Sequence, residues 1–162
     1  MAKIVGPNDG DRVDLGGLGV RFMIDGETAG GGFSLVEHPI APRTLAAPLH
    51  RHVNEDEYSY VLEGRMGAQL GDETVEAGPG ELVFKPRNQW HAFWNPGDEP
   101  ARVLEIISPA GFERYFEEIA PLLPPNRPEP DLATLLQVAA RYGLEMDPES
   151  IGPLMEKHGL TG

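Results

Sequence analysis

Between residues 19 and 109 the sequence alternates short runs of strand-forming residues with tight turns, and this pattern limits the folds open to the chain. Gly-Asp-Glu, Gly-Pro-Gly and Asn-Pro-Gly-Asp mark turns between the runs. Short strands at this spacing, with no helical pattern between them, predict an all-β antiparallel barrel or jelly roll. The expected strands are Val20–Ile24, Phe33–His38, Glu57–Glu63, Ala68–Leu70, Thr74–Glu76, Glu81–Lys85, His91–Trp94 and Arg102–Ile107.

After residue 110 the pattern becomes helical. We therefore expect a β-barrel domain over residues 1–110 and a short α-helical C-terminal extension over residues 111–162. Apolar residues in Gly111–Leu123 recur at the spacing of one helix face. The extension has no metal-ligand or nucleophile pattern, so we expect it to pack on the barrel or on a neighbouring subunit.

Two further helices are expected in this extension. Asp131 is a candidate N-cap for a helix that ends at Gly143, and a last short helix is expected within Ser150–His158, closed by Gly159. Between the first two helices, prolines predict a stiff extended connector. These prolines are Pro121, Pro124, Pro125, Pro128 and Pro130.

The composition excludes several classes of partner. The 162 residues carry a formal net charge of −13 and include no cysteine. Without a cluster of lysine and arginine, binding to nucleic acid or to an anionic membrane is not expected. Without cysteine, disulfides and thiolate metal ligands are excluded. Residues 1–13 lack the apolar stretch of a signal peptide, and no segment has the length of a membrane helix, so we expect a cytoplasmic protein.

Three histidines and one glutamate form the most informative pattern in the chain. His50 and His52 are two residues apart, so in extended backbone both imidazoles face the same side. Glu57 follows after a short loop, and strand phase favours it as a ligand over its acidic neighbours Glu55 and Asp56. His91 begins a later strand. Three imidazoles and one carboxylate suit a divalent first-row metal such as Fe, Mn, Co, Ni, Cu or Zn, and can leave two octahedral positions open.

The spacing of these residues resembles the two sequence motifs of the cupin superfamily. The first motif is matched by His50, His52, Glu57 and Gly64, and the second by Gly80, Pro86, His91 and Asn95. Two motif glycines are replaced, by Thr44 and by Asn88. Asparagine is the residue after glycine that most easily adopts a left-handed turn, so the turn at Asn88 is expected to persist.

The resemblance implies a fold, a cofactor and a range of functions. The fold is a single-domain double-stranded β-helix, the cupin jelly-roll barrel, which holds one divalent transition metal ion per chain. Small cupins often form homodimers, and the Ala2–Val5 segment is a candidate strand for such pairing. The ligand set is similar to that of one-domain quercetinase-like dioxygenases, which implies a dioxygenase for a small chelating compound that is oxygen-rich or aromatic. A non-catalytic small-molecule sensor and a metal-dependent isomerase remain alternatives.

Further site residues follow from strand phase and from the implied mechanism. Glu57 is the expected catalytic residue, because its carboxylate could accept the proton of a substrate hydroxyl. Phe93 has the same phase as His91, and Ser59 the same phase as Glu57, so both are expected to line a substrate pocket. His38 has no partner pattern in the sequence and is expected to be an ordinary surface or core residue.

Overall fold

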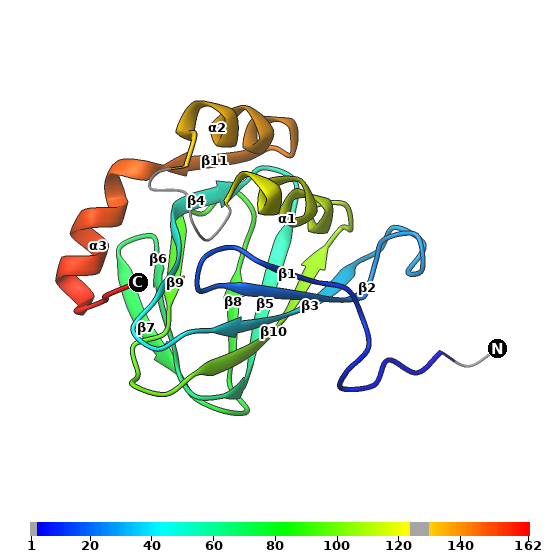
Figure 1. Ribbon diagram of the computed structural model, residues 1–162, viewed down its shortest axis with the longest axis horizontal. Coiled ribbons are helices and arrows are strands. Elements are labelled where there is room, and N and C mark those ends of the chain that lie inside the picture. The colour runs from blue at the N-terminus through cyan, green and yellow to red at the C-terminus, as the bar shows by residue number, and fades with distance from the viewer. Residues whose placement is uncertain (1–2, 124–129) are drawn as a thin grey trace.

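A computed structural model describes residues 3–123 and 130–162, which form two antiparallel sheets that face each other (Figure 1). The predicted all-β jelly roll is confirmed. In the six-stranded sheet the order is β1 (Arg12–Asp14), β2 (Gly19–Ile24), β3 (Ser34–Ile40), β10 (Ala101–Ser108), β5 (Asp56–Glu63) and β8 (Leu82–Lys85). In the five-stranded sheet the order is β11 (Leu144–Asp147), β4 (Leu45–His52), β9 (His91–Trp94), β6 (Met66–Leu70) and β7 (Glu73–Ala77).

Alternating side chains of both sheets fill the space between them. On β10, Val103, Glu105 and Ile107 are almost fully buried, while the residues between them are partly exposed, as a strand with one face on the core requires. Val61 and Met66 are likewise sealed from solvent. One of these inward positions therefore carries a carboxylate rather than an apolar group.

The C-terminal extension contains helices α1 (Glu113–Ile119), α2 (Leu132–Arg141) and α3 (Ile151–His158), with 3-10 turns η1 (Ala120–Leu122) and η2 (Pro148–Ser150). The predicted cap of α2 is confirmed, because Asp131 accepts a hydrogen bond from the backbone N–H of Thr134 at 3.2 Å. Gly159 ends α3 in a left-handed conformation, also as predicted. Of the expected proline connector, Pro124, Pro125 and Pro128 lie outside the described residues.

One strand of the extension was not foreseen. β11 pairs with β4, so that Leu144 lies opposite His52 and Met146 lies opposite His50. The extension thus completes the five-stranded sheet and continues it beside the two histidines. In the Ala2–Val5 segment, residue 2 lies outside the described residues and residues 3–5 belong to no strand.

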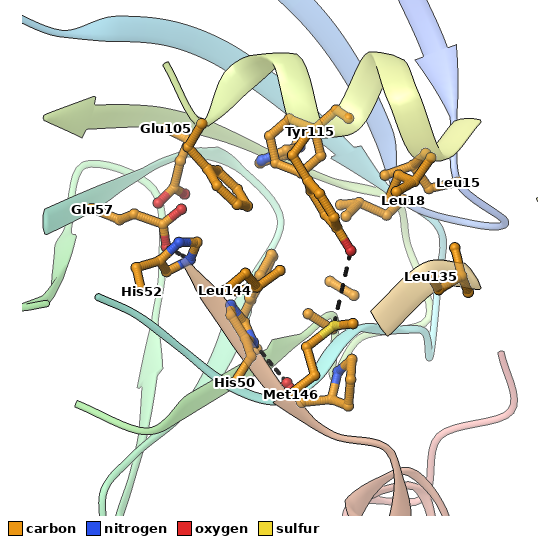
Figure 2. A pocket seen from close by; sticks show the side chains of 18 of the residues that line it. Leu15, Leu18, His50, His52, Glu57, Glu105, Tyr115, Leu135, Leu144 and Met146 are labelled. Atoms are coloured by element: carbon orange, nitrogen blue, oxygen red, sulfur yellow. Dashed lines mark hydrogen bonds and ion pairs between the residues drawn. The ribbon is translucent and has the colours of Figure 1, made fainter. Parts of the chain in front are cut away.

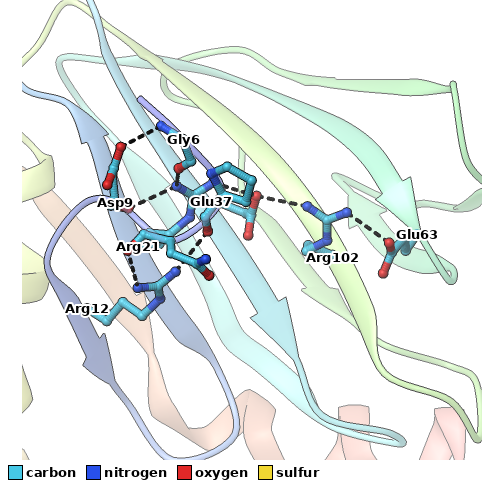
Figure 3. A network of polar contacts seen from close by, with 9 residues as sticks. Gly6, Asp9, Arg12, Arg21, Glu37, Glu63 and Arg102 are labelled. Atoms are coloured by element: carbon cyan, nitrogen blue, oxygen red, sulfur yellow. Dashed lines mark hydrogen bonds and ion pairs between the residues drawn. The ribbon is translucent and has the colours of Figure 1, made fainter. Parts of the chain in front are cut away.

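An ion-pair network fastens the N-terminal segment to the outside of the six-stranded sheet (Figure 3). The buried Arg21 donates to the backbone oxygens of Gly6 and Asp9 and to the Glu37 carboxylate, which also accepts from Arg102. The main chain at Gly6 and Asp9 is therefore held by side-chain contacts. Among the described residues, no helix is long and apolar enough to cross a membrane.

Candidate metal centre and cavity

The four predicted metal ligands come from three strands that the fold brings together. His50 and His52 end β4, Glu57 lies near the start of β5, and His91 begins β9. All four side chains are buried, and one ligand atom from each lies within 4.8 Å of the others. β4 and β9 pair with His50 directly opposite His91, which places those two imidazole rings 4.2 Å apart.

Backbone carbonyls orient two of the imidazoles. Nδ1 of His50 lies 2.7 Å from the Pro48 oxygen, and Nδ1 of His91 lies 3.0 Å from the Gln89 oxygen. A carbonyl oxygen only accepts, so each Nδ1 carries the proton and each Nε2 keeps its lone pair for a metal.

The remaining nitrogens fit a metal as well. Glu57 Oε2 lies 3.3 Å from Nε2 of His52 and 3.4 Å from Nε2 of His91, without hydrogen-bond geometry. Both of these Nε2 atoms are buried and have no hydrogen-bond partner among the described residues. A divalent transition metal bound between these nitrogens and the carboxylate would give each of the buried atoms a partner.

The charges around Glu57 keep the carboxylate ionised. Burial opposes its ionisation, but His52 and Lys85 outweigh burial and hold the pKa of Glu57 well below its usual range. Burial also opposes a charge on His52, but Glu57 and Glu55 outweigh it and raise the pKa of His52 to about 9. Burial and the neighbouring imidazoles hold the pKa of His50 well below its ordinary value. A metal at this position would replace the proton of His52 as the partner of the carboxylate.

A buried lysine next to the ligands was missed by the sequence reasoning. Lys85 is 1% exposed, and its Nζ lies 3.1 Å from Glu57 and 2.7 Å from Glu105. Glu105 also accepts a hydrogen bond of 2.6 Å from the hydroxyl of Ser59, and the Lys85 ammonium lies 4.7 Å from the ring centre of Phe93. Neither charged residue belongs to a ligand motif, but the alternation of buried and exposed positions along β8 and β10 places both inward.

The charged residues flanking the ligands have other partners. Arg51 points away from the ligands, as its position between two inward histidines predicts, and pairs with Glu145 of β11. Arg87 pairs with Asp56 at the entry to β5. Glu55, which strand phase disfavours as a ligand, is also buried, with its carboxylate 3.7 Å from Nδ1 of His52.

Three of the four proposed ligands, His50, His52 and Glu57, form part of the wall of a cavity of about 290 Å³, whereas His91 is not among its lining residues (Figure 2). Apart from these ligands, His38, Lys85 and Glu105, the wall is largely apolar. Phe93 lines the cavity, whereas Ser59 lies behind Glu105 and is not among the described lining residues. The C-terminal extension contributes a large share of the wall through Phe112, Tyr115, Phe116, Ile119, Leu123, Leu135, Leu144, Met146 and Ile151.

Fold and site together define a small jelly-roll protein with a buried cluster of three histidines and one glutamate that could hold one metal ion. Residues 37–107 match the family described as "Cupin domain". The polyketide cyclase RemF from Streptomyces resistomycificus is 33% identical, with a TM-score of 0.57, over 67% of this chain and 80% of RemF. The chain therefore belongs to the cupin superfamily.

Two further comparisons show other proteins to which the chain is similar. The tetracenomycin polyketide synthase protein TcmJ from Streptomyces glaucescens is 38% identical over 60 residues, which are 37% of this chain and 40% of TcmJ. The chain therefore spans less than half the length of TcmJ. KdgF from Halomonas sp. superposes with a TM-score of 0.62 over 70% of this chain and 99% of KdgF, but at 16% identity it shows the fold alone.

Proposed function

We propose that the chain is a metal-dependent enzyme that acts on an apolar, oxygen-bearing aromatic compound. One divalent transition metal ion, held by His50, His52, Glu57 and His91, would supply Lewis-acid polarisation of substrate oxygens. The observation that carries this proposal is the cluster of four ligand atoms, because three of the residues that supply them, His50, His52 and Glu57, line a largely apolar cavity. Such a cavity suits a carbon skeleton with a few oxygens that bind at one end.

Residues of the chain would bind this substrate and move its proton. Aromatic and aliphatic side chains from both sheets and from the extension would receive the skeleton and exclude water. Glu57 is the proposed proton acceptor for a substrate hydroxyl, because its ionised carboxylate lies between the imidazoles of His52 and His91. Lys85 is a positioning residue, since its ammonium contacts Glu57 and Glu105 at once.

The reaction class that we favour is a ring closure with loss of water. In such a reaction a carbon–carbon bond forms between an enolisable carbon and a carbonyl carbon, and the resulting hydroxyl group leaves as water. The likeness to RemF, a polyketide cyclase at 33% identity, supports this choice. No oxidant or reductant is needed.

A dioxygenase is the second candidate. The set of three histidines and one glutamate favours it, because cupin dioxygenases of the quercetinase kind use this combination. The two candidates differ in whether O₂ is consumed when substrate is converted. Both require the metal, so one set of proteins tests them together.

The test is elemental analysis of the purified protein, followed by incubation with a panel of aromatic β-diketones and flavonols under air. We expect about one transition metal ion per chain in the wild type and none in the His50→Ala/His52→Ala variant. Arg51→Ala is the matched control, because Arg51 lies between the two histidines but pairs with Glu145. It should keep the metal.

Product mass and O₂ uptake then separate the reactions. Loss of water without O₂ uptake supports ring closure, and O₂ uptake supports the dioxygenase. A metal-loaded protein that converts nothing in the panel would favour a binding or sensing protein, or an isomerase. A wild type that takes up no metal after reconstitution would overturn the proposal.

A further inference from the structure

A histidine outside the proposed ligand set, His38, reaches the same cavity from the sheet opposite His50 and His52. His38 lies on β3, opposite Val103 of β10, and shares its inward phase with the buried Val36 and Ile40. Its side chain is 2% exposed and lines the cavity, although it belongs to no metal-ligand pattern. The two nitrogens of a buried imidazole need hydrogen-bond partners, which apolar packing does not supply.

One edge of the His38 ring is fixed by the backbone. Nδ1 lies 2.9 Å from the carbonyl oxygen of Gly19 on the neighbouring strand β2, so Nδ1 carries a proton and donates it. Burial lowers the pKa of His38 and outweighs the opposing effect of Glu105, which keeps the ring neutral. A neutral ring with a proton on Nδ1 has a lone pair on Nε2, and that atom is an acceptor.

The acceptor is open to the cavity. Nε2 of His38 has no hydrogen-bond partner among the described residues. Other unpartnered atoms, such as Nε2 of His52, are fully buried, but Nε2 of His38 keeps a small accessible surface. Because the ring is almost wholly buried and lines the cavity, the accessible part of Nε2 faces that space.

Two aromatic rings hold His38 in place. Phe116 of α1 packs edge to face against it with ring centres 5.4 Å apart, and Phe93 of β9 lies at 6.2 Å. Phe93 also contacts the ammonium of Lys85, so it links His38 to the charged part of the cavity. The acceptor is thus fixed in direction and surrounded by apolar surface, which strengthens a hydrogen bond made there.

We propose that His38 is a specificity-determining residue: its Nε2 accepts a hydrogen bond from a hydroxyl group of the ligand. The ligand class is then a hydroxylated aromatic compound that presents one hydroxyl to His38 in addition to the oxygens near the metal ligands. This inference rests on the proposed function for the identity of the cavity as the substrate site. It does not rest on the metal.

The test compares 2-naphthol with 2-methoxynaphthalene, which has a similar skeleton but no hydroxyl proton, by calorimetric titration. His38→Asn keeps an amide near the position of Nδ1, which can donate to Gly19, and removes the acceptor at Nε2. His38→Gln places an amide oxygen near the position of Nε2 and gives up the Gly19 contact. We expect His38→Asn to weaken 2-naphthol binding about tenfold, to leave 2-methoxynaphthalene unchanged, and His38→Gln to restore part of the loss.

Equal weakening of both ligands by His38→Asn would indicate a packing role and overturn the proposal. So would equal affinity of the wild type for the two ligands, or the absence of 2-naphthol binding. The titrations are repeated on protein treated with a chelator. Because the His38 contact needs no metal, its loss or survival there is independent of whether the metal proposal is correct. If the variants do not fold, ¹⁵N spectra of the wild-type imidazoles report the protonation state of His38. A His38 ring that is charged, or protonated on Nε2, would contradict the inference.

Discussion

Asn95 follows strand β9, which carries the proposed ligand His91, and connects it to the loop that follows β3. Its side-chain N–H groups donate to the backbone oxygens of Ile40, Ala41 and Glu99, and its carbonyl oxygen accepts from the N–H of Gly97. The residue is wholly buried. A single amide therefore contacts four backbone groups, which gives the last position of the second motif a structural rather than a catalytic role.

Replacing Asn95 with alanine should lower the free energy of unfolding by about 3 kcal/mol, because it leaves several buried backbone groups without a partner. Urea denaturation of the metal-free protein measures this. Asn88→Gly is the matched control in the same motif. Asn88 has a φ of 65°, so glycine fits there, and a change within about 1 kcal/mol is expected. Similar losses in both variants would contradict the role given to Asn95.

At the scale of elements, the pairing of β11 with β4 is the feature that joins the extension to the site. β4 carries two of the proposed ligands, and without β11 its outer edge would present unpaired backbone groups. The pairing also brings Leu144 and Met146 to the cavity wall beside His50 and His52. The extension therefore covers a sheet edge and closes part of the cavity at the same time.

Leu144→Ala should destabilise the protein by about 2–3 kcal/mol, because the leucine is 5% exposed and its truncation leaves a larger void. Glu145→Ala is the control on the same strand. That side chain points outward to an exposed ion pair with Arg51, and its loss should cost about 0.5 kcal/mol. Thermal and urea unfolding of the two variants provide the comparison. A larger loss for Glu145→Ala would mean that β11 is held by its outer face.

At the scale of the whole molecule, the net charge of −13 reflects many carboxylates, so the free energy of unfolding should depend on pH in the acid range. Hydrogen bonds from arginines lower the pKa values of exposed carboxyls on separate strands and loops, among them Glu63, Glu76 and Asp98. A carboxyl whose pKa is lower in the folded chain contributes stability above its unfolded pKa, and this contribution is lost as the pH falls through the folded pKa.

We therefore expect the free energy of unfolding to decrease as the pH falls below 4.5, the ordinary value for glutamate. Urea denaturation between pH 3 and pH 6, a range about the ordinary values of Asp and Glu, measures the slope. A Glu63→Gln/Glu76→Gln/Asp98→Asn variant should show a shallower slope, because three of the titrating groups are gone. An unchanged slope would mean that these surface pairs add nothing to the acid response.

Patterns that are local in sequence were sufficient to predict the cluster of three histidines and one glutamate and the fold class. Strand alternation puts His50 and His52 on one side, and turn residues divide the chain into short strands, because both effects act between neighbours along the backbone. The N-cap at Asp131 and the left-handed turn at Asn88 were predictable for the same reason.

Only the tertiary structure decided which distant residues share the cavity. Lys85 reaches Glu57 because β5 and β8 pair in that register, and Glu105 meets Ser59 through the pairing of β5 with β10. His38 and the strand β11 enter the cavity wall by the same long-range pairing. Sheet register depends on the simultaneous packing of all the strands, so no spacing in the sequence encodes it. The residues proposed as metal ligands can thus be recognised from local sequence patterns, whereas the cavity beside them depends on the whole fold.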